Sequence, residues 1–488
     1  MTIANLNPER VWKNFYALTQ IPRPSKKEGK VVEFMEKFGK SLGLETIKDE
    51  VGNIIIRKPA TPGMENRKGI ILQGHLDMVP QNNIDTPHDW EKDPIDAYEY
   101  DLDGEKWVKA RGTTLGADNG MGVATAMAVL EAKDLVHGPI EALFTIDEET
   151  GMTGAFALKP GVLKGQILIN LDSESEGEIY VGCAGGLDGS FTFDYKGEAA
   201  PKGYKFFEIS VKGMRGGHSG MEINEGRGNA NKTMARLLLP VLDKMDGRLA
   251  SIHGGNLRNA IPREAVAVVA VPEANVSKMK RKVADIGKKV KAELALIDPN
   301  VVIAVKPAAK AKVMAGDVAL NVVKAVLACP NEVVRMSNAM ENLVETSSNL
   351  AMVNSDGRRV RIECLLRSSV DTAKENLADA IASVMTLAGG KVKYSGAYSG
   401  WNPNMKSPIL AQMIEEYEGL YGKEPAVMAI HAGLECGVIG AKYEGLDMVS
   451  VGPTLCSPHS PDERVNVATV GKFWDFIVKV LANAPVKE

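Results

Sequence analysis

Residues 69–80 read GIILQGHLDMVP, in which the apolar run at residues 69–72 is followed by a histidine and an aspartate. A short apolar run of this kind is typical of a buried strand. Side chains two positions apart on an extended segment point the same way, so His75 and Asp77 are expected to face one side. Asp77 can then hydrogen-bond the far nitrogen of His75 and orient it as a metal ligand. Taken alone, the motif favours a surface histidine in a strand-end turn over a metal ligand.

Other apolar runs in the chain also end at polar residues, and each indicates a buried strand. They are residues 140–146 before Glu148 and Glu149, residues 167–171 before Asp172, and residues 448–451 before the loop of His459. Residues 119–132 have the composition of a helix. Alternating strands and helices predict an open, mostly parallel α/β sheet. Ligands of such sheets gather at the carboxyl ends of the strands, so these polar residues are expected to converge.

The converging set of imidazoles and carboxylates can hold two metal ions. Asp118, in the glycine-rich GTTLGADNG at residues 112–120, can bridge two metals about 3.5–4 Å apart, and it can also cap a helix. Glu148 and Glu149 face opposite ways if the chain is extended there. One can bind metal while the other, with a pKa raised by burial and a like-charged neighbour, acts as a general base.

Residues 187–397 have a different pattern of apolar and polar residues from the rest of the chain. Half-exposed strands and one charged amphipathic helix at residues 276–296 are expected there. Candidate metal ligands lie on both sides of this stretch. The simplest architecture is a catalytic domain of residues 1–186 and 398–488, interrupted by an inserted α+β lid domain of residues 187–397. The sequence therefore predicts an α/β di-metal domain with an inserted lid.

Charge and cysteine content narrow the possible partners. The 488-residue chain has a formal net charge of -4, from 58 basic and 62 acidic residues, which gives no footprint for nucleic acid or an anionic membrane. A small molecule or a peptide is the expected partner. The first 20 residues have no apolar secretory core, and the five cysteines form no CxxC pair. We therefore expect a cytoplasmic protein with free thiols.

Several longer motifs together resemble a known family. GHLDMVPQ, KARGTTLGADNG, CAGG, GGHSG, RNAIPRE, HAGLECG and GPTLCSPHSPDERV are similar, across essentially the whole chain, to the di-zinc metallopeptidases of the carboxypeptidase G2, peptidase T and carnosinase kind. The resemblance implies two Zn²⁺ ions per chain, for which Co²⁺ or Mn²⁺ can substitute. It also implies one role for each candidate: His75 and Asp172 bind one zinc, Glu149 and His459 bind the other, Asp118 bridges them, Asp77 orients His75, and Glu148 is the general base. A cis peptide bond between Asp118 and Asn119 is implied as well.

The resemblance also implies substrate-binding residues in the inserted domain. His218 would reach a neighbouring active site across a homodimer and steady the developing oxyanion. Asn259 and Arg367 would hold the substrate carboxylate, for which the planar guanidinium fork is well suited. His431 and Glu435 in HAGLECG would line the site, although a helix start explains them equally well. Without the resemblance, His218, Asn259 and Arg367 would be interpreted as structural.

The implied activity is metal-dependent hydrolysis of dipeptides, preferentially aminoacyl-histidine dipeptides. The nearest alternative is a di-metal deacylase of N-acyl amino acids, which would use the same ligands and the same base. A third possibility is a non-catalytic protein that metals only stabilise. Glu148 separates this last possibility from the others, because a structural site is closed by its ligands and needs no free base beside it.

Overall fold

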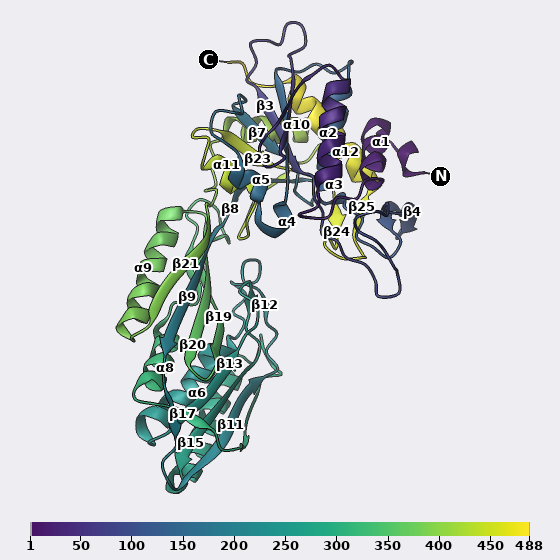
Figure 1. Ribbon diagram of the computed structural model, residues 1–488. Helices are drawn as coiled ribbons and strands as arrows, with labels where there is room; N and C mark the ends of the chain where they lie inside the picture. Colours follow the sequence, from purple (N-terminus) through teal and green to yellow (C-terminus); the bar gives the residue numbers. More distant parts are fainter. Residues whose placement is uncertain (1, 488) are drawn as a thin grey trace. The chain divides into compact units, whose positions relative to one another are not determined.

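The computed structural model describes residues 2–487 and divides the chain into two compact units. Unit 1 comprises Met1–Gly182, Pro403–Ala429 and Leu434–Glu488, and unit 2 comprises Cys183–Asn402 and Ile430–Gly433 (Figure 1). Unit 1 contains every residue expected to bind metal. A lid function for unit 2 stays a prediction.

The sheet of unit 1 has eight strands in the order β1-β2-β6-β3-β7-β23-β8-β22. Its four central strands are parallel and correspond to the four apolar runs, so these strand predictions are confirmed: β6 (Ile140–Thr145), β3 (Ile70–His75), β7 (Ile167–Asn170) and β23 (Asp447–Ser450). Antiparallel pairing joins β1 to β2, β2 to β6 and β8 to β23, so the sheet as a whole is mixed. The α/β prediction is correct, with parallel pairing confined to the centre.

Other elements of unit 1 surround this sheet. Its remaining sheet strands are β1 (Glu45–Lys48), β2 (Ile54–Lys58), β8 (Glu178–Cys183) and β22 (Ala426–Ile430). A four-stranded sheet contains β24 (Leu455–Cys456), β25 (Arg464–Asn466), β5 (Glu105–Ala110) and β4 (Ala97–Leu102). The helices are η1 (Ile3–Asn5), α1 (Glu9–Thr19), α2 (Gly29–Ser41), α3 (Ala117–Glu131), α4 (Glu148–Gly151), α5 (Thr153–Ala157), α10 (Pro408–Tyr421), α11 (Glu435–Gly440) and α12 (Val467–Ala482).

Helix α3 confirms the helix expected at residues 119–132 and packs on β3 and β6. Small residues allow this close approach: a Cβ atom on Gly122 would lie 2.3 Å from the carbonyl oxygen of Leu171, just after β7. The first residues of α3 therefore lie close to the carboxyl ends of the central strands. This position brings Asp118 to the edge of the sheet where the other candidate ligands gather.

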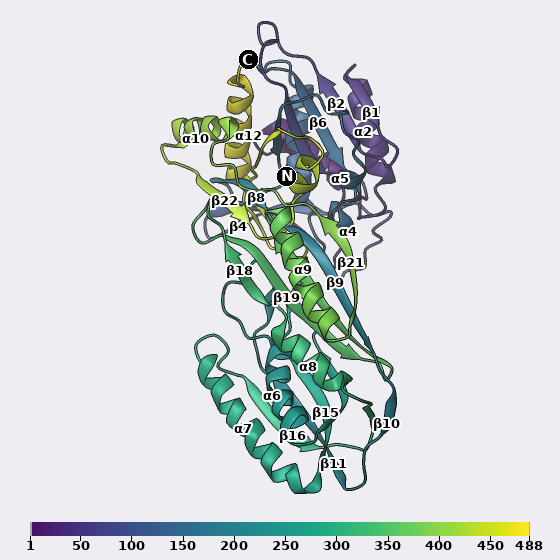
Figure 2. The ribbon, with the colours of Figure 1, turned by 90° about the vertical axis from the view of Figure 1, so that its left-hand side faces the viewer.

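Unit 2 contains a nine-stranded sheet, of which eight strands follow the order β16-β11-β15-β13-β19-β20-β9-β21 while β18 pairs with β19. Helices α6 to α9 lie on one face of this sheet (Figure 2). The strands of unit 2 are β9 (Gly185–Asp194), β10 (Gly197–Ala199), β11 (Tyr204–Lys212), β12 (Gly217–His218), β13 (Arg248–Gly254), β14 (Ala260–Ile261), β15 (Ala265–Pro272), β16 (Val302–Pro307), β17 (Lys312–Met314), β18 (Glu332–Met336), β19 (Val344–Ser355), β20 (Arg359–Ser368) and β21 (Lys391–Tyr398). Its helices are α6 (Ala230–Lys244), η2 (Glu273–Asn275), α7 (Val276–Glu293), α8 (Val318–Ala328) and α9 (Asp371–Leu387).

Helix α7 confirms the amphipathic helix expected near residues 276–296, since it buries only one stripe, which includes Met279, Val283 and Val290. One large cluster of buried apolar side chains joins the helices of unit 2 to its sheet. Among residues 2–487, no helix has the length and apolarity needed to cross a membrane.

Candidate metal centre

The carboxyl ends of the central strands lie side by side. In the parallel register, His75 at the end of β3 lies opposite Thr145 at the end of β6. Asn170 at the end of β7 lies opposite Ser450 at the end of β23. The residues that follow these strands therefore lie at one edge of the sheet, as the sequence predicted.

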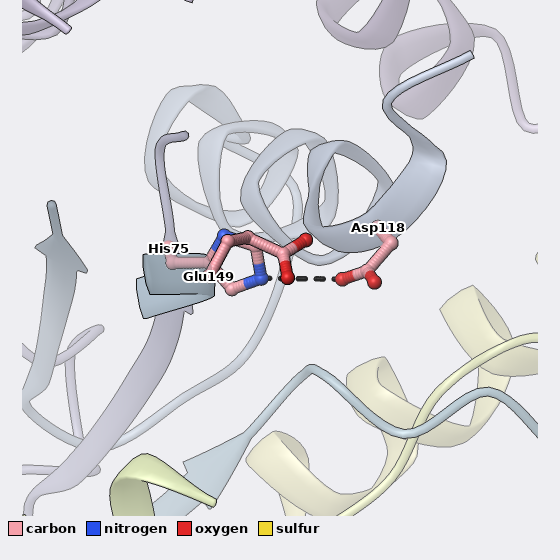
Figure 3. Close-up of side chains that lie close together, drawn as sticks. All are labelled: His75, Asp118 and Glu149. Atoms are coloured by element: carbon pink, nitrogen blue, oxygen red, sulfur yellow. Dashed lines mark hydrogen bonds and ion pairs between the residues drawn. The ribbon is translucent and has the colours of Figure 1, made fainter. Parts of the chain in front are cut away.

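Asp118 lies at the middle of the converging side chains and presents one oxygen to each side. Its Oδ1 is 3.1 Å from His75 Nε2, which is also 3.3 Å from Asp172 Oδ1. Its Oδ2 is 3.1 Å from His459 Nε2, which is also 3.0 Å from Glu149 Oε2. Figure 3 shows His75, Asp118 and Glu149, whose ligand atoms all lie within 4.8 Å of one another. The side chains thus form two His–carboxylate pairs that share one aspartate.

This donor set fits divalent cations. A zinc ion with bonds of about 2.0–2.2 Å keeps neighbouring tetrahedral ligand atoms roughly 3.3–3.6 Å apart, close to the distances between the paired atoms here. Nitrogen and carboxylate oxygen donors suit zinc and several other first-row metals. Glu149 Oε1 is buried and has no hydrogen-bond partner in the described chain. Three carboxylates concentrated in a largely buried space need cations or protons to balance their charge.

Burial and shared hydrogen bonds strongly shift the pKa values of the histidines and carboxylates in this site. Hydrogen bonds from His459 to Asp118 and Glu149 raise the pKa of His459 to about 11. Burial raises the pKa of Asp172 to about 7. Burial alone would lower the pKa of His75, but the neighbouring aspartates outweigh it and raise that pKa well above its usual value. Metal ligands must be deprotonated, so a bound cation would take the place of these protons.

Asp77 connects two of the site segments. His75 Nδ1 lies 3.1 Å from the backbone carbonyl oxygen of Asp77 and 3.4 Å from its carboxylate. The carboxylate also accepts the backbone N–H groups of Glu148 at 3.0 Å and Glu149 at 3.3 Å. The Ser25 hydroxyl donates to it at 2.8 Å. Burial would raise the pKa of Asp77, but its bonds to His75 and to these donors lower it to about 2. Asp77 therefore carries a negative charge beside His75, in the position expected of a group that orients it.

The expectation of an extended chain at Glu148 and Glu149 is wrong. Both residues lie in the first turn of α4, which begins immediately after Asp147, a residue with a left-handed φ of 52°. The Asp77 carboxylate stabilises this turn by accepting its first N–H groups. The two side chains still diverge, because successive helical residues point about 100° apart.

Glu148 and Glu149 have different surroundings. Glu149 reaches His459, whereas the Glu148 side chain forms no hydrogen bond or ion pair with any part of residues 2–487. Burial raises the pKa of Glu148 well above its usual value; His75 opposes the shift, while Asp172 and Glu435 add to it. A carboxyl group with a raised pKa and free oxygens beside the candidate metal centre can accept and return a proton.

The candidates in the inserted region all lie in unit 2. Arg367, on β20, is 5% exposed and donates to the Tyr398 hydroxyl at 3.3 Å, while its Nε atom is buried without a partner in the described chain. Burial lowers the pKa of His218, and the nearby Arg367 lowers it further. Asn259 is exposed, and its carbonyl accepts the N–H of Ser219 at 2.8 Å. The charge of Arg367 thus acts on His218, and Asn259 is hydrogen-bonded to the His218 loop through Ser219.

The two candidates in HAGLECG, His431 and Glu435, lie in different units. Glu435 begins α11, so the helix-start interpretation is confirmed, and it accepts hydrogen bonds from Gln73 at 2.6 Å and Thr145 at 2.7 Å. Burial raises the pKa of Glu435 to about 7. His431 lies in unit 2, with its Nε2 atom 2.7 Å from the Ser347 hydroxyl.

Sequence reasoning missed two buried charged side chains beside the centre, Arg23 and Glu463. Arg23 stands between two prolines, and Glu463 closes the SPHSPDE segment that contains His459. A single charge in a loop carries no periodic signal, so only the proximity of Glu463 to His459 could have drawn attention to it. The implied cis peptide bond between Asp118 and Asn119 is confirmed.

Comparison with known proteins agrees with this geometry. The model of peptidase family M20/M25/M40 matches residues 71–483. The Escherichia coli (strain K12) protein named cytosol non-specific dipeptidase is 46% identical over 486 residues, which cover 99% of each chain. The crystal structure of aminoacylhistidine dipeptidase from Vibrio alginolyticus has a TM-score of 0.94 at 47% identity, over 100% of this chain and 99% of that one. The structure of aminopeptidase PepT from Bacillus cereus shares the fold, with a TM-score of 0.57 at 17% identity over 98% of this chain and 99% of that one. The chain therefore belongs to peptidase family M20/M25/M40.

Proposed function

We propose that this chain is a dipeptidase that binds two zinc ions and prefers aminoacyl-histidine dipeptides. The observation that carries the proposal is the arrangement around Asp118, whose two oxygens face the pairs His75–Asp172 and His459–Glu149. In this assignment each pair holds one metal and Asp118 bridges them. Co²⁺ or Mn²⁺ can replace zinc, because the affinities of such sites for these metals overlap.

Glu148 moves the proton in the proposed reaction. When bound, a pair of divalent cations lowers the pKa of a water molecule and polarises a carbonyl oxygen. Glu148 accepts the proton of the attacking water and returns it to the nitrogen of the leaving amine, as a general base does in amide hydrolysis. Asp77 keeps His75 in one orientation throughout, since its carboxylate is fixed by the N–H groups that begin α4.

The substrate preference is tested with a panel of dipeptides. The relatives carry two names, one a non-specific dipeptidase and the other an aminoacylhistidine dipeptidase. We expect Xaa-His dipeptides to give the highest kcat/KM and their N-acetyl forms to be poor substrates. Faster cleavage of the N-acetyl forms would instead identify a deacylase. Metal analysis of the active enzyme should give two metals per chain, and fewer than two would contradict the bridging role of Asp118.

We further propose that Arg367 and Asn259 hold the substrate carboxylate and that His218 stabilises the oxyanion. Arg367→Lys should raise KM about tenfold or more with little change in kcat, because an ammonium cannot form the bidentate pair. Arg258→Lys is the matched control, since Arg258 is already paired with Asp188 at 2.8 Å and Glu363 at 3.0 Å. An equal rise in KM in both variants would contradict the assignment of Arg367.

We also propose a cytoplasmic homodimer. The word cytosol in the name of the Escherichia coli relative supports the location. Light scattering on the purified chain, with a calculated mass of 52.5 kDa, gives the oligomeric state directly. A monomer that retains full activity would contradict the role of a partner subunit.

A further inference from the structure

Glu463 is a buried carboxylate that binds the backbone of the loop carrying Asp118. It is 2% exposed and lies four residues after His459. Its Oε2 atom accepts the N–H groups of Leu115 at 2.7 Å and Gly116 at 2.9 Å, and its Oε1 atom accepts those of Ala117 at 2.7 Å and Asp118 at 3.2 Å. One side chain therefore accepts four consecutive backbone donors, the last of which belongs to Asp118.

The four N–H groups need such an acceptor because they lie at and just before the start of α3. Gly116 has a left-handed φ of 72°, and Asp118 has φ -83° and ψ 113°. The N–H groups at the start of a helix have no carbonyl partner within the helix. Unpaired buried N–H groups are costly, so removal of the Glu463 carboxylate would leave the loop free to take another conformation.

Arg23 ties the same loop to the segment that contains His75 and Asp77. Its guanidinium donates to the carbonyl oxygen of Gly116 and to those of Leu76 at 3.0 Å and Asp77 at 3.1 Å. Arg23 is 2% exposed, and burial lowers its pKa, although the surrounding carboxylates oppose that shift. Two segments that are distant in sequence are thus joined through one planar group.

We propose that Glu463 is a positioning residue that, together with Arg23, fixes the Asp118 carboxylate at the place where it can serve two metals. The proposal rests on the two-metal function proposed above. Glu463 fixes the backbone conformation of the loop, and Arg23 fixes the distance between the loop and the segment that contains His75. Neither side chain touches the metals in this assignment.

The test is Glu463→Gln, with metal affinity as the readout. Glutamine offers one acceptor oxygen and turns an NH₂ group toward donors, so two of the four N–H groups lose their partner. We expect zinc binding to weaken about 10- to 100-fold, the usual effect of losing a group that supports a metal ligand. The measurement titrates the full-length apoprotein with Zn²⁺ against a chromogenic chelator, and the Tm of the apoprotein is recorded alongside.

Glu141→Gln is the matched control. Glu141 is also buried and accepts two backbone N–H groups, those of Lys164 at 2.6 Å and Gly165 at 2.7 Å. It lies near the start of β6, at the opposite end of the strand from the metal centre. We expect this variant to lower Tm while keeping wild-type zinc affinity, so that loss of stability and loss of positioning are separated.

Glu463→Gln with a lowered Tm and unchanged zinc affinity would overturn the proposal. If that variant does not fold, Arg23→Lys takes its place: lysine keeps the charge but cannot span three carbonyl groups, and unchanged affinity there would overturn the proposal equally. A failure of the two-metal function itself is distinguishable, because it would appear in the wild-type protein as fewer than two bound metals.

Discussion

Glu148 and Glu149 are neighbours in the chain, yet their side chains meet different surroundings. Glu149 lies 3.0 Å from His459, and Glu148 forms no ion pair or hydrogen bond through its side chain in the described residues. Burial raises the pKa of Glu148 well above its usual value. The local sequence DEE could indicate that the two glutamates have different roles, but not which glutamate has which role. That depends on where His459 lies in the fold.

Glu148→Gln and Glu149→Gln should therefore give different defects. The first should keep two metals per chain and lose about 10²- to 10⁴-fold in kcat, the usual contribution of a general base. The second should bind less metal, because it removes a charged ligand from the His459 pair. Metal analysis and steady-state kinetics on both variants provide the measurement. Full turnover in Glu148→Gln with its metals in place would refute the assignment.

Because His431 is buried, we expect the stability of unit 2 to decrease in acid. Burial, with a smaller effect from Arg367, lowers the pKa of His431 to about 3. Between pH 6.5 and 3 the unfolded chain therefore binds one more proton at this residue than the folded chain. The free energy of unfolding should fall as pH falls in this window, by about 1.4 kcal/mol per pH unit from this group.

His431→Gln should remove that part of the pH dependence. Urea unfolding of unit 2 is monitored through the hydrogen exchange of its peptides at several values between pH 6.5 and 5. The measurement gives the slope of the free energy of unfolding against pH. His253→Gln is the control, because His253 is exposed on β13 of the same unit. Parallel stability profiles for wild type and His431→Gln would show that this histidine does not carry the effect.

Among the elements, the strands were predictable because each apolar run is short and is followed by polar residues, as the run at residues 69–72 is followed by Gln73 and His75. The order β6-β3-β7-β23 was not predictable, since each run is equally apolar and any order would bury it. The α4 turn was missed because its first N–H groups are accepted by Asp77, a residue about 70 positions away.

Close packing of α3 on the sheet leads to a prediction about Gly122. Its Cβ would lie 2.3 Å from the Leu171 carbonyl oxygen, a backbone atom that cannot turn aside. Gly122→Ala should therefore push α3 away from β7, cost about 1–3 kcal/mol of stability and weaken metal binding through Asp118. Thermal unfolding and zinc titration measure both effects.

Gly471→Ala in α12 is the matched control for Gly122→Ala. No atom lies within 4 Å of the Cβ position at Gly471, so alanine should stabilise this helix by roughly 0.5–1 kcal/mol. Wild-type stability in Gly122→Ala would mean that α3 does not depend on this close approach.

At the scale of the whole molecule, the candidate ligands could be chosen from the sequence because each follows a strand or begins a helix. Arg23 and Glu463 could not, because their roles consist of contacts with backbone atoms about 50 and 350 residues away. Any polar side chain of suitable length could make such contacts, and no local pattern marks them. The convergence of the candidate ligands was thus predictable, whereas the groups that support Asp118 required the fold.

Removal of metal should destabilise unit 1 selectively, because all the candidate ligands lie within that unit. A ligand present at 1,000 times its Kd adds about 4 kcal/mol to the free energy of unfolding, and each kcal/mol shifts Tm by roughly 2–4 °C in a domain of this order of size. Treatment with a chelator should lower Tm and increase hydrogen exchange in β3 and α3 of unit 1, while β15 of unit 2 stays protected. Added Zn²⁺ should restore both. An equal increase in exchange in both units would mean that the metals stabilise more than the sheet edge at which Asp118, His75 and His459 meet.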